Sequence, residues 1–167
     1  MAATGSETPT VKRQAVMLLV FLVVALAAGI VGNLLQGSDV SGRYLQLDRP
    51  AWAPPSWAFG VVWPVLYVLI GLAGWLVWRS TGREAWRGPL ALWMLQLVVN
   101  AIWPGVFFGV EAYGPAVAVI VVLVGLVGAT IISFVRHQVR LAAWLLVPYL
   151  LWIVYATALN VAIAAAN

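Results

Sequence analysis

The chain has 167 residues, of which 64% are hydrophobic and only 8% are charged, and its formal net charge is +4. About a quarter of the residues in a soluble globular domain are charged, so this composition excludes an ordinary soluble fold. The sequence contains no cysteine, which excludes both a disulfide framework and a thiolate metal site.

Five long uncharged stretches separate the clusters of charged residues. Each stretch can supply the ~20 apolar residues that cross a ~30 Å hydrocarbon core as a helix. The predicted spans lie near residues 14–35, 58–78, 89–108, 114–135 and 141–163. We therefore predict an all-α integral membrane protein, a bundle of five transmembrane helices forming a single domain over residues 14–167.

Residues 1–13 form the predicted disordered tail, because their composition is polar. A cleaved signal peptide is the rival interpretation of the first span. Its apolar run continues to Leu35, which is longer than the 7–15 residues of a signal-peptide core. The length favours a retained helix.

The connection between the first two spans, residues 36–57, is too long for a simple turn. Pro50, Pro54 and Pro55 hold the segment RPAWAPPSW in an extended, stiff conformation. Long connections in compact domains are often functional lids. We expect this structured loop to act as a lid over one end of the bundle.

The basic residues are distributed unevenly between the two ends of the predicted bundle. One end would carry Lys12, Arg13, Arg79, Arg83, Arg87, Arg136 and Arg140, and the other only Arg43 and Arg49. The positive-inside rule places the first end, with the N-terminus, in the cytoplasm. The pattern suits a bacterial inner membrane, and these residues orient the protein rather than bind nucleic acid.

No predicted span contains an acidic or basic residue, whereas coupled transporters need such a group inside the membrane. The single histidine, His137, lies in a basic loop. Paired carboxylates, nucleophile–histidine arrangements and clusters of metal ligands are absent from the sequence. We therefore predict no metal site, no required cofactor and no conventional catalytic site.

Neutral polar and aromatic residues recur at helical spacing in three spans. They are Phe59, Trp63 and Tyr67; Trp93, Gln96, Asn100, Trp103 and Phe107; and Tyr149, Trp152, Ala156 and Asn160. Singly, each could be a core aromatic or an interhelical hydrogen-bonding group. Together, these faces converge on the outer half of the bundle beneath the lid, which predicts an aromatic pocket for a flat, mostly apolar ligand.

The remaining tryptophans lie near span ends, where amphipathic rings favour the headgroup region. They are Trp52, Trp57, Trp75, Trp78, Trp86 and Trp144. Two small-residue motifs, GVFFG at 105–109 and AAGIVG at 27–32, would allow close helix approach. They could serve a homodimer or packing within the monomer.

Three segments resemble the TspO/MBR family, the tryptophan-rich sensory proteins related to the mitochondrial translocator protein, also called the peripheral-type benzodiazepine receptor. They are YLQLDRPAWAPPSWAFGVVWPVLY at 44–67, QLVVNAIWPGVFF at 96–108 and WLLVPYLLWIVYATALN at 144–160. Their order and spacing in a five-span protein make the resemblance specific.

The resemblance implies a dimeric five-helix receptor or sensor that binds tetrapyrroles such as protoporphyrin IX and haem. In many members it also implies binding of sterols and of isoquinoline or benzodiazepine drugs. By motif position the ligand would meet Tyr44, Pro54, Trp63, Tyr67, Gln96, Asn100, Trp152, Ala156 and Leu159. Trp103 and Phe107 are also expected to line the site, because they share a helical face with Gln96 and Asn100 in the third span.

The resemblance leaves two alternatives to a receptor. One is light- and oxygen-dependent porphyrin degradation involving Trp63 and Trp152, and the other is transport of tetrapyrroles or other hydrophobic molecules. The sterol-recognition pattern of animal members ends in a basic residue after a tyrosine, but no Lys or Arg follows Arg140. This departure weakens the support that the resemblance gives to high-affinity sterol binding, and leaves sterol binding open.

Overall fold

The computed structural model describes residues 11–38, 40–82 and 88–167. The helices are α1 (Val11–Leu35), α2 (Val40–Gln46), α3 (Ser56–Thr81), α4 (Pro89–Pro104), the π-helical turn η2 (Gly105–Gly109), α5 (Tyr113–Arg136) and α6 (Arg140–Ala166). Five helical segments, α4 with η2 counted as one, are long and apolar enough to cross a membrane. The predicted all-α, five-span architecture is confirmed.

The structure departs from the prediction at the start of the first helix and within the first connection. The first helix begins at Val11, so the disordered tail predicted over residues 1–13 is wrong for its last three residues; residues 1–10 lie outside the described part of the chain. The connection predicted over 36–57 contains the short helix α2, which the sequence analysis did not foresee. α3 then begins at Ser56, directly after Pro54 and Pro55, which keep the preceding backbone extended.

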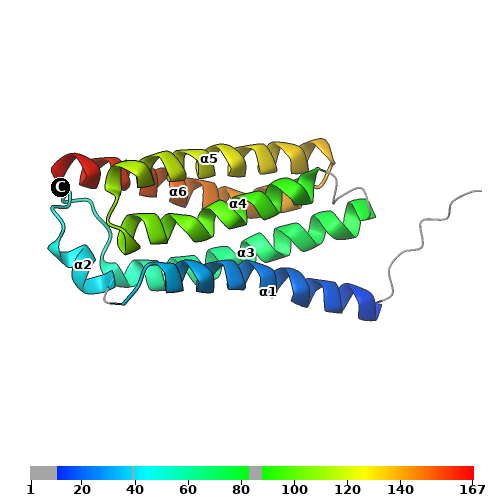
Figure 1. The fold of residues 1–167 in the computed structure, drawn as a ribbon. Coiled ribbons are helices and arrows are strands. Elements are labelled where there is room, and N and C mark those ends of the chain that lie inside the picture. Colours follow the sequence, from blue (N-terminus) through cyan, green and yellow to red (C-terminus); the bar gives the residue numbers. More distant parts are fainter. Residues whose placement is uncertain (1–10, 39, 83–87) are drawn as a thin grey trace, which may run out of the picture.

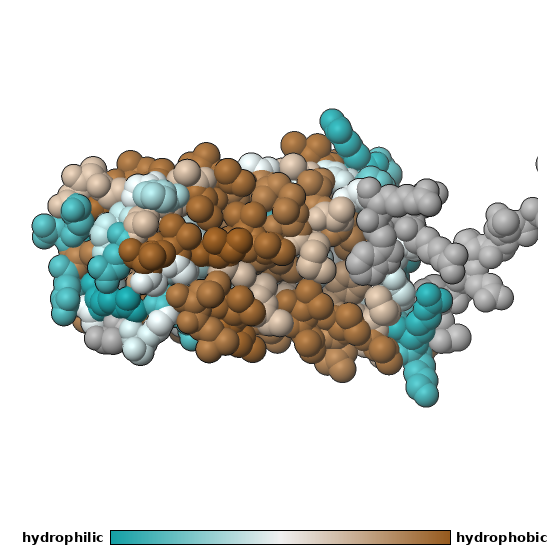
Figure 2. All heavy atoms as spheres, in the orientation of Figure 1, coloured by the Kyte–Doolittle hydropathy of each residue, from teal (hydrophilic) through white to brown (hydrophobic). Residues whose placement is uncertain are grey.

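The long helices run side by side along one axis, and α2 lies across one end of the bundle beside the C-terminus (Figure 1). α1 packs on α3 and α4, α6 packs on α3 and α5, and α5 packs on α4. We call the end that carries α2 the lid end. The opposite end, called the basic end, carries Lys12, Arg13, Arg79, Arg136 and Arg140. Figure 2 shows a hydrophobic belt between two hydrophilic ends, as a membrane-spanning bundle requires.

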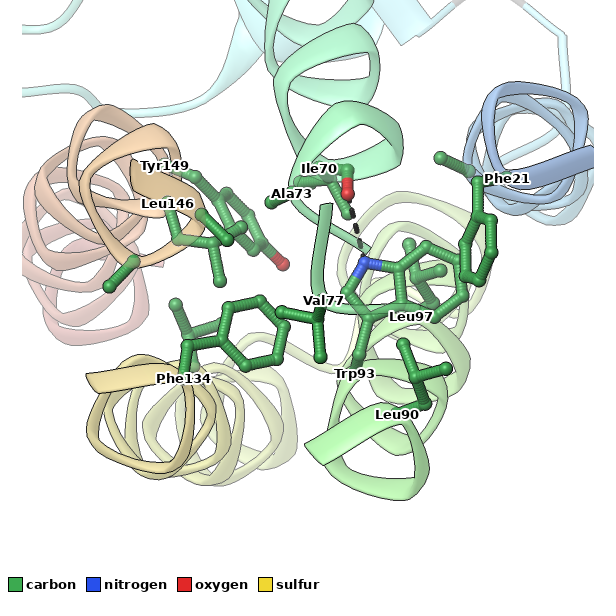
Figure 3. Packing of buried hydrophobic residues seen from close by; sticks show 14 of the residues in the cluster. Phe21, Ile70, Ala73, Val77, Leu90, Trp93, Leu97, Phe134, Leu146 and Tyr149 are labelled. Carbon is green, nitrogen blue, oxygen red and sulfur yellow. Dashed lines mark hydrogen bonds between the residues drawn. The ribbon is translucent and has the colours of Figure 1, made fainter. Parts of the chain in front are cut away.

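The core between α1, α3 and α4 is organised around Trp93 (Figure 3). Its indole N–H donates a 2.9 Å hydrogen bond to the Ile70 carbonyl of α3, and the Phe21 ring of α1 meets it edge-on at 5.1 Å. Gly74 makes room for both rings, since a Cβ there would lie 2.7 Å from Trp93 and 2.9 Å from Phe21. Helices α1 and α3 are therefore in close contact in this part of the bundle.

The tryptophans predicted to form an interfacial belt differ in how far they are exposed, and Trp52 is 49% exposed. Trp57 and Trp144 are about 70% exposed, at 69% and 70%, as lipid-facing anchors should be. Trp78 is only 6% exposed and lies beneath the guanidinium of Arg13, so its predicted place in the belt is wrong. The Trp75 indole donates to the Gln14 carbonyl at 3.1 Å. Trp86 lies outside the described residues.

Both small-residue motifs pack inside the monomer. A Cβ at Gly105 would lie 2.9 Å from the Leu35 side chain, and one at Gly109 would collide with the Leu35 carbonyl. On α1, a Cβ at Gly32 would come within 3.3 Å of Pro104. The glycines therefore let the lid ends of α1 and η2 approach closely. Homodimer formation stays a prediction that does not depend on them.

Candidate ligand-binding site

A groove of about 690 Å³ opens at the lid end between α1 and α3, with α2, α4 and η2 contributing to its walls. Its volume falls within the range of small-molecule sites, about 300–1,000 Å³. Seven aromatic side chains line it: Tyr44, Trp57, Phe59, Trp63, Tyr67, Trp103 and Phe108. We call this cavity the lid groove.

Residues with little or no side-chain volume create the space. Gly29 of α1 lies against the Tyr67 ring, and a Cβ there would come within 2.8 Å of ring atoms. Gly60 of α3 lines the groove, and a Cβ on it would meet nothing within 4 Å. Pro64, one turn later, has no N–H to donate to the Gly60 carbonyl. At the lid end of α3, the missing side chain of Gly60 therefore leaves open space between the large aromatic residues that line the groove.

A buried hydrogen-bond chain fixes the deep wall of the groove. Tyr67 donates through its hydroxyl to Asn100 Oδ1 at 2.7 Å, and Asn100 Nδ2 donates to the Tyr149 hydroxyl oxygen at 3.0 Å. The Trp63 ring stacks on Tyr67 with centroids 5.6 Å apart and meets Tyr149 at 6.3 Å. These two hydrogen bonds link α3, α4 and α6, so three helices set the orientation of this aromatic wall.

Two side chains of α2 hold the connection between α1 and α3, the segment that was expected to act as a lid. Tyr44 is buried, and its hydroxyl donates to the Pro54 carbonyl at 2.8 Å. Burial raises the pKa of Tyr44, although the nearby Arg49 opposes this shift, so the phenol remains a donor at neutral pH. Arg43 donates to the carbonyl oxygens of Phe108 at 2.6 Å, Gln36 at 2.7 Å and Ser38 at 2.8 Å. These bonds satisfy carbonyls near the ends of α1 and η2.

The part of the expected site contributed by α6 lies behind the groove. Ala156 and Leu159 line a void of only about 10 Å³ together with Phe107 and Asn160, and Phe59 is among the four aromatic residues that line both this void and the groove. The Trp152 ring meets Phe59 at 5.8 Å. Its buried indole N–H has no acceptor among the described residues.

The structure thus brings together only some of the expected site residues. Tyr44, Trp63, Tyr67 and Trp103 line the groove. Phe107, Ala156 and Leu159 line the small void, while Pro54 and Asn100 support the groove through hydrogen bonds. Gln96, which donates to the Trp93 carbonyl at 2.9 Å, and Trp152 line neither space.

Sequence reasoning missed the wall that α1 contributes. Leu26, Gly29, Ile30 and Asn33 all line the groove. Their spacing of three, one and three residues places them on one helical face. An asparagine near the end of an otherwise apolar span was the available signal. Across the described ranges, no group of three or more His, Cys, Asp or Glu side chains could hold a metal ion.

Comparison with known proteins identifies the family of this chain. The model of the TspO/MBR family matches residues 20–166. The chain belongs to the TspO/MBR family. The match extends from within α1 to the end of α6, so it includes every residue that lines the lid groove.

Several TspO/MBR proteins are similar over most of their length. The human translocator protein is 39% identical over 120 residues, which cover 70% of each chain. The tryptophan-rich sensory protein of Cereibacter sphaeroides is 36% identical over 144 residues, covering 86% of this chain and 87% of the relative. The tryptophan-rich protein TspO of Archaeoglobus fulgidus is 33% identical over 150 residues, covering 90% and 96%.

Proposed function

We propose that the protein is a membrane receptor or sensor that binds flat tetrapyrroles, such as protoporphyrin IX and haem, in the lid groove. The observation that carries this proposal is the aromatic-lined cavity of about 690 Å³ between α1 and α3. Family membership supports the ligand class, because the TspO/MBR resemblance implies tetrapyrrole binding.

The chemistry of the walls suits a flat aromatic ligand. Trp63 and Tyr67 form a stacked pair with an interplanar angle of 27°, which presents a broad aromatic surface. Aromatic rings gain about 0.5–1.5 kcal/mol per offset or edge contact beyond the burial of apolar area. No described residue accepts a hydrogen bond from the Trp63 indole, which leaves this N–H available to a ligand.

The groove is accessible from outside the bundle. Two of its α1 residues, Leu26 and Ile30, are 39% and 61% exposed, and Trp57 at the start of α3 is 69% exposed. In a bilayer these positions would face lipid, so a hydrophobic ligand could reach the groove from the membrane. A ligand that enters from the lipid needs no charged residue inside the spans to attract it, so this access supports the binding of a hydrophobic ligand.

The proposed location is a bacterial inner membrane with the basic end in the cytoplasm. Lys12, Arg13, Arg79, Arg136 and Arg140 lie at the basic end, and the positive-inside rule places such an end in the cytoplasm. The lid groove would then be on the opposite, outer side.

A titration of the purified full chain in nanodiscs with protoporphyrin IX, followed by porphyrin absorbance and tryptophan quenching, tests the proposal. Wild type should show saturable binding above the partitioning into empty nanodiscs. Trp63→Phe should weaken binding, because Trp63 lines the groove, and Trp144→Phe should not, because Trp144 is 70% exposed on another helix. Partitioning without saturation in wild type would reject tetrapyrrole binding.

A second candidate function, light-dependent porphyrin degradation, draws support from the place of Trp63 in the groove wall. Its indole would lie against the macrocycle, whereas Trp152 lies behind Phe59. Illumination of the complex in air should give a new absorbing product in wild type and Trp152→Phe but not in Trp63→Phe. If illumination leaves the absorbance of the wild-type complex unchanged, light-dependent degradation is rejected and only the receptor function remains.

A further inference from the structure

The lid groove is polar at one end only. Asn33 of α1, Gln36 just after α1, Ser41 of α2 and Ser56 of α3 line it at the lid end, and we call these four residues the polar rim. Leu26, Trp63 and Tyr67 line its deeper part. Trp63 and Tyr67 lie seven and eleven residues beyond the start of α3, or roughly 10 and 16 Å at about 1.5 Å per residue.

The hydrogen-bonding groups of the polar rim are unused. Within the described ranges, no residue donates to or accepts from the side chains of Asn33, Gln36, Ser41 or Ser56. The Tyr67 hydroxyl in the deep wall is instead committed to Asn100. A ligand therefore meets amide and hydroxyl groups without protein partners at the lid end. Beyond them, the deeper wall formed by Trp63 and Tyr67 offers the Trp63 indole as a donor that no described residue uses.

Among the described residues, the charged groups in contact with residues that line the groove near the rim are two arginines. Arg43 donates to the carbonyls of Gln36 and Phe108, both of which line the groove. The Arg49 guanidinium lies 4.5 Å from the ring centroid of Tyr44, another lining residue. The described acidic side chains at this end are Asp48 and Glu111, and neither lines the groove. Glu111 lies 3.7 Å from Arg43.

We propose that the polar rim binds the carboxylate groups of an amphipathic ligand and so sets its orientation. The acid groups lie at the lid end against Asn33, Ser41 and Ser56, and the apolar ring system extends inward against Trp63 and Tyr67. Neutral N–H and O–H donors form short, strong hydrogen bonds to carboxylates. This inference rests on the proposed function, because it assigns the orientation and the specificity of the same site.

Protoporphyrin IX and its dimethyl ester share the macrocycle and differ only in the acid groups. A comparison of their affinities therefore distinguishes the contribution of the polar rim to binding from that of the rest of the groove. Both are titrated into full-length protein in nanodiscs, with empty nanodiscs subtracted. The variants are wild type, Asn33→Ala/Ser56→Ala and, as control, Ser80→Ala, an exposed serine near the basic end of α3. Thermal unfolding of each variant shows whether it is folded.

Wild type should bind the free acid roughly tenfold more tightly than the ester, because two charge-assisted hydrogen bonds distinguish them. The double variant should lose most of this preference through weaker binding of the acid, with ester binding unchanged. Equal affinity of wild type for both compounds, or a double variant that keeps the full preference, overturns the inference. Saturable binding of neither compound rejects the proposed function instead.

Discussion

Tyr67 of α3 donates a 2.7 Å hydrogen bond to Asn100 of α4 inside the bundle. The same asparagine donates to Tyr149 of α6 at 3.0 Å, and all three residues are buried. In hydrocarbon, no water can replace a lost partner. This chain therefore couples the deep wall of the lid groove to the packing of three helices.

Tyr67→Phe and Tyr149→Phe should each lower the free energy of unfolding by about 1 kcal/mol, the scale of one interhelical hydrogen bond in a membrane. The double variant should be less destabilised than the sum, by about 0.5 kcal/mol or more, because both tyrosines use one amide. Thermal or denaturant unfolding in detergent measures these values. Tyr113→Phe is the control, since the Tyr113 hydroxyl has no hydrogen-bond partner among the described residues. Strict additivity would contradict the shared role of Asn100.

Gly29→Ala should narrow the lid groove. The new Cβ would come within 2.8 Å of Tyr67 ring atoms, so the ring must shift away from its bond to Asn100. We expect overpacking to lower stability by about 1–3 kcal/mol and porphyrin affinity to fall on the order of tenfold. Gly125→Ala on α5 is the matched control, because its Cβ would meet nothing within 4 Å. Unchanged affinity in Gly29→Ala would place the ligand elsewhere.

Arg43→Met should loosen the lid. Three carbonyl oxygens lose their donor, and a partly buried acceptor without a partner costs about 1–3 kcal/mol. Amide hydrogen exchange over residues 40–55 should accelerate on the order of tenfold. Arg43→Lys should restore little, because one ammonium cannot reproduce the fork of a guanidinium.

Glu111→Gln separates these hydrogen bonds from the ion pair. It removes only the 3.7 Å contact of a carboxylate that is 56% exposed, so it should change exchange in the lid little. Equal effects of Arg43→Met and Glu111→Gln would mean that the ion pair, rather than the carbonyl bonds, holds the lid.

Gly109→Ala should destabilise the monomer fold itself. The added Cβ would collide with the Leu35 carbonyl at the end of α1, and neither backbone can yield easily. We expect a lower unfolding temperature with no change of oligomeric state, measured by differential scanning fluorimetry and by light scattering in the same detergent. Gly128→Ala, whose Cβ would meet nothing within 4 Å, is the control. A shift from dimer to monomer without loss of stability would show instead that GVFFG forms an interface between copies.

The amino-acid sequence by itself determined that the protein is a five-span helical bundle. Transmembrane helices are specified by length and apolarity, and both are local properties of the chain. The three motifs determined the family, and helical spacing placed Trp63 and Tyr67 on one face of α3. Tyr44 and Trp103 were likewise predicted for the site and line the groove.

Tertiary structure alone decided which helical faces meet. Spacing along one helix identifies residues that share a face, but not the neighbour that this face contacts. Asn33 therefore lines the groove, although the sequence showed only an asparagine near the end of an apolar span. Trp152 does not line the groove, because it packs against Phe59, which does. Trp78 was buried under Arg13 for the same reason, although its position near a span end suited an interfacial anchor. The packing of α1 against α3, α4 and η2 is a long-range property, because glycines distant in sequence set how closely the backbones approach.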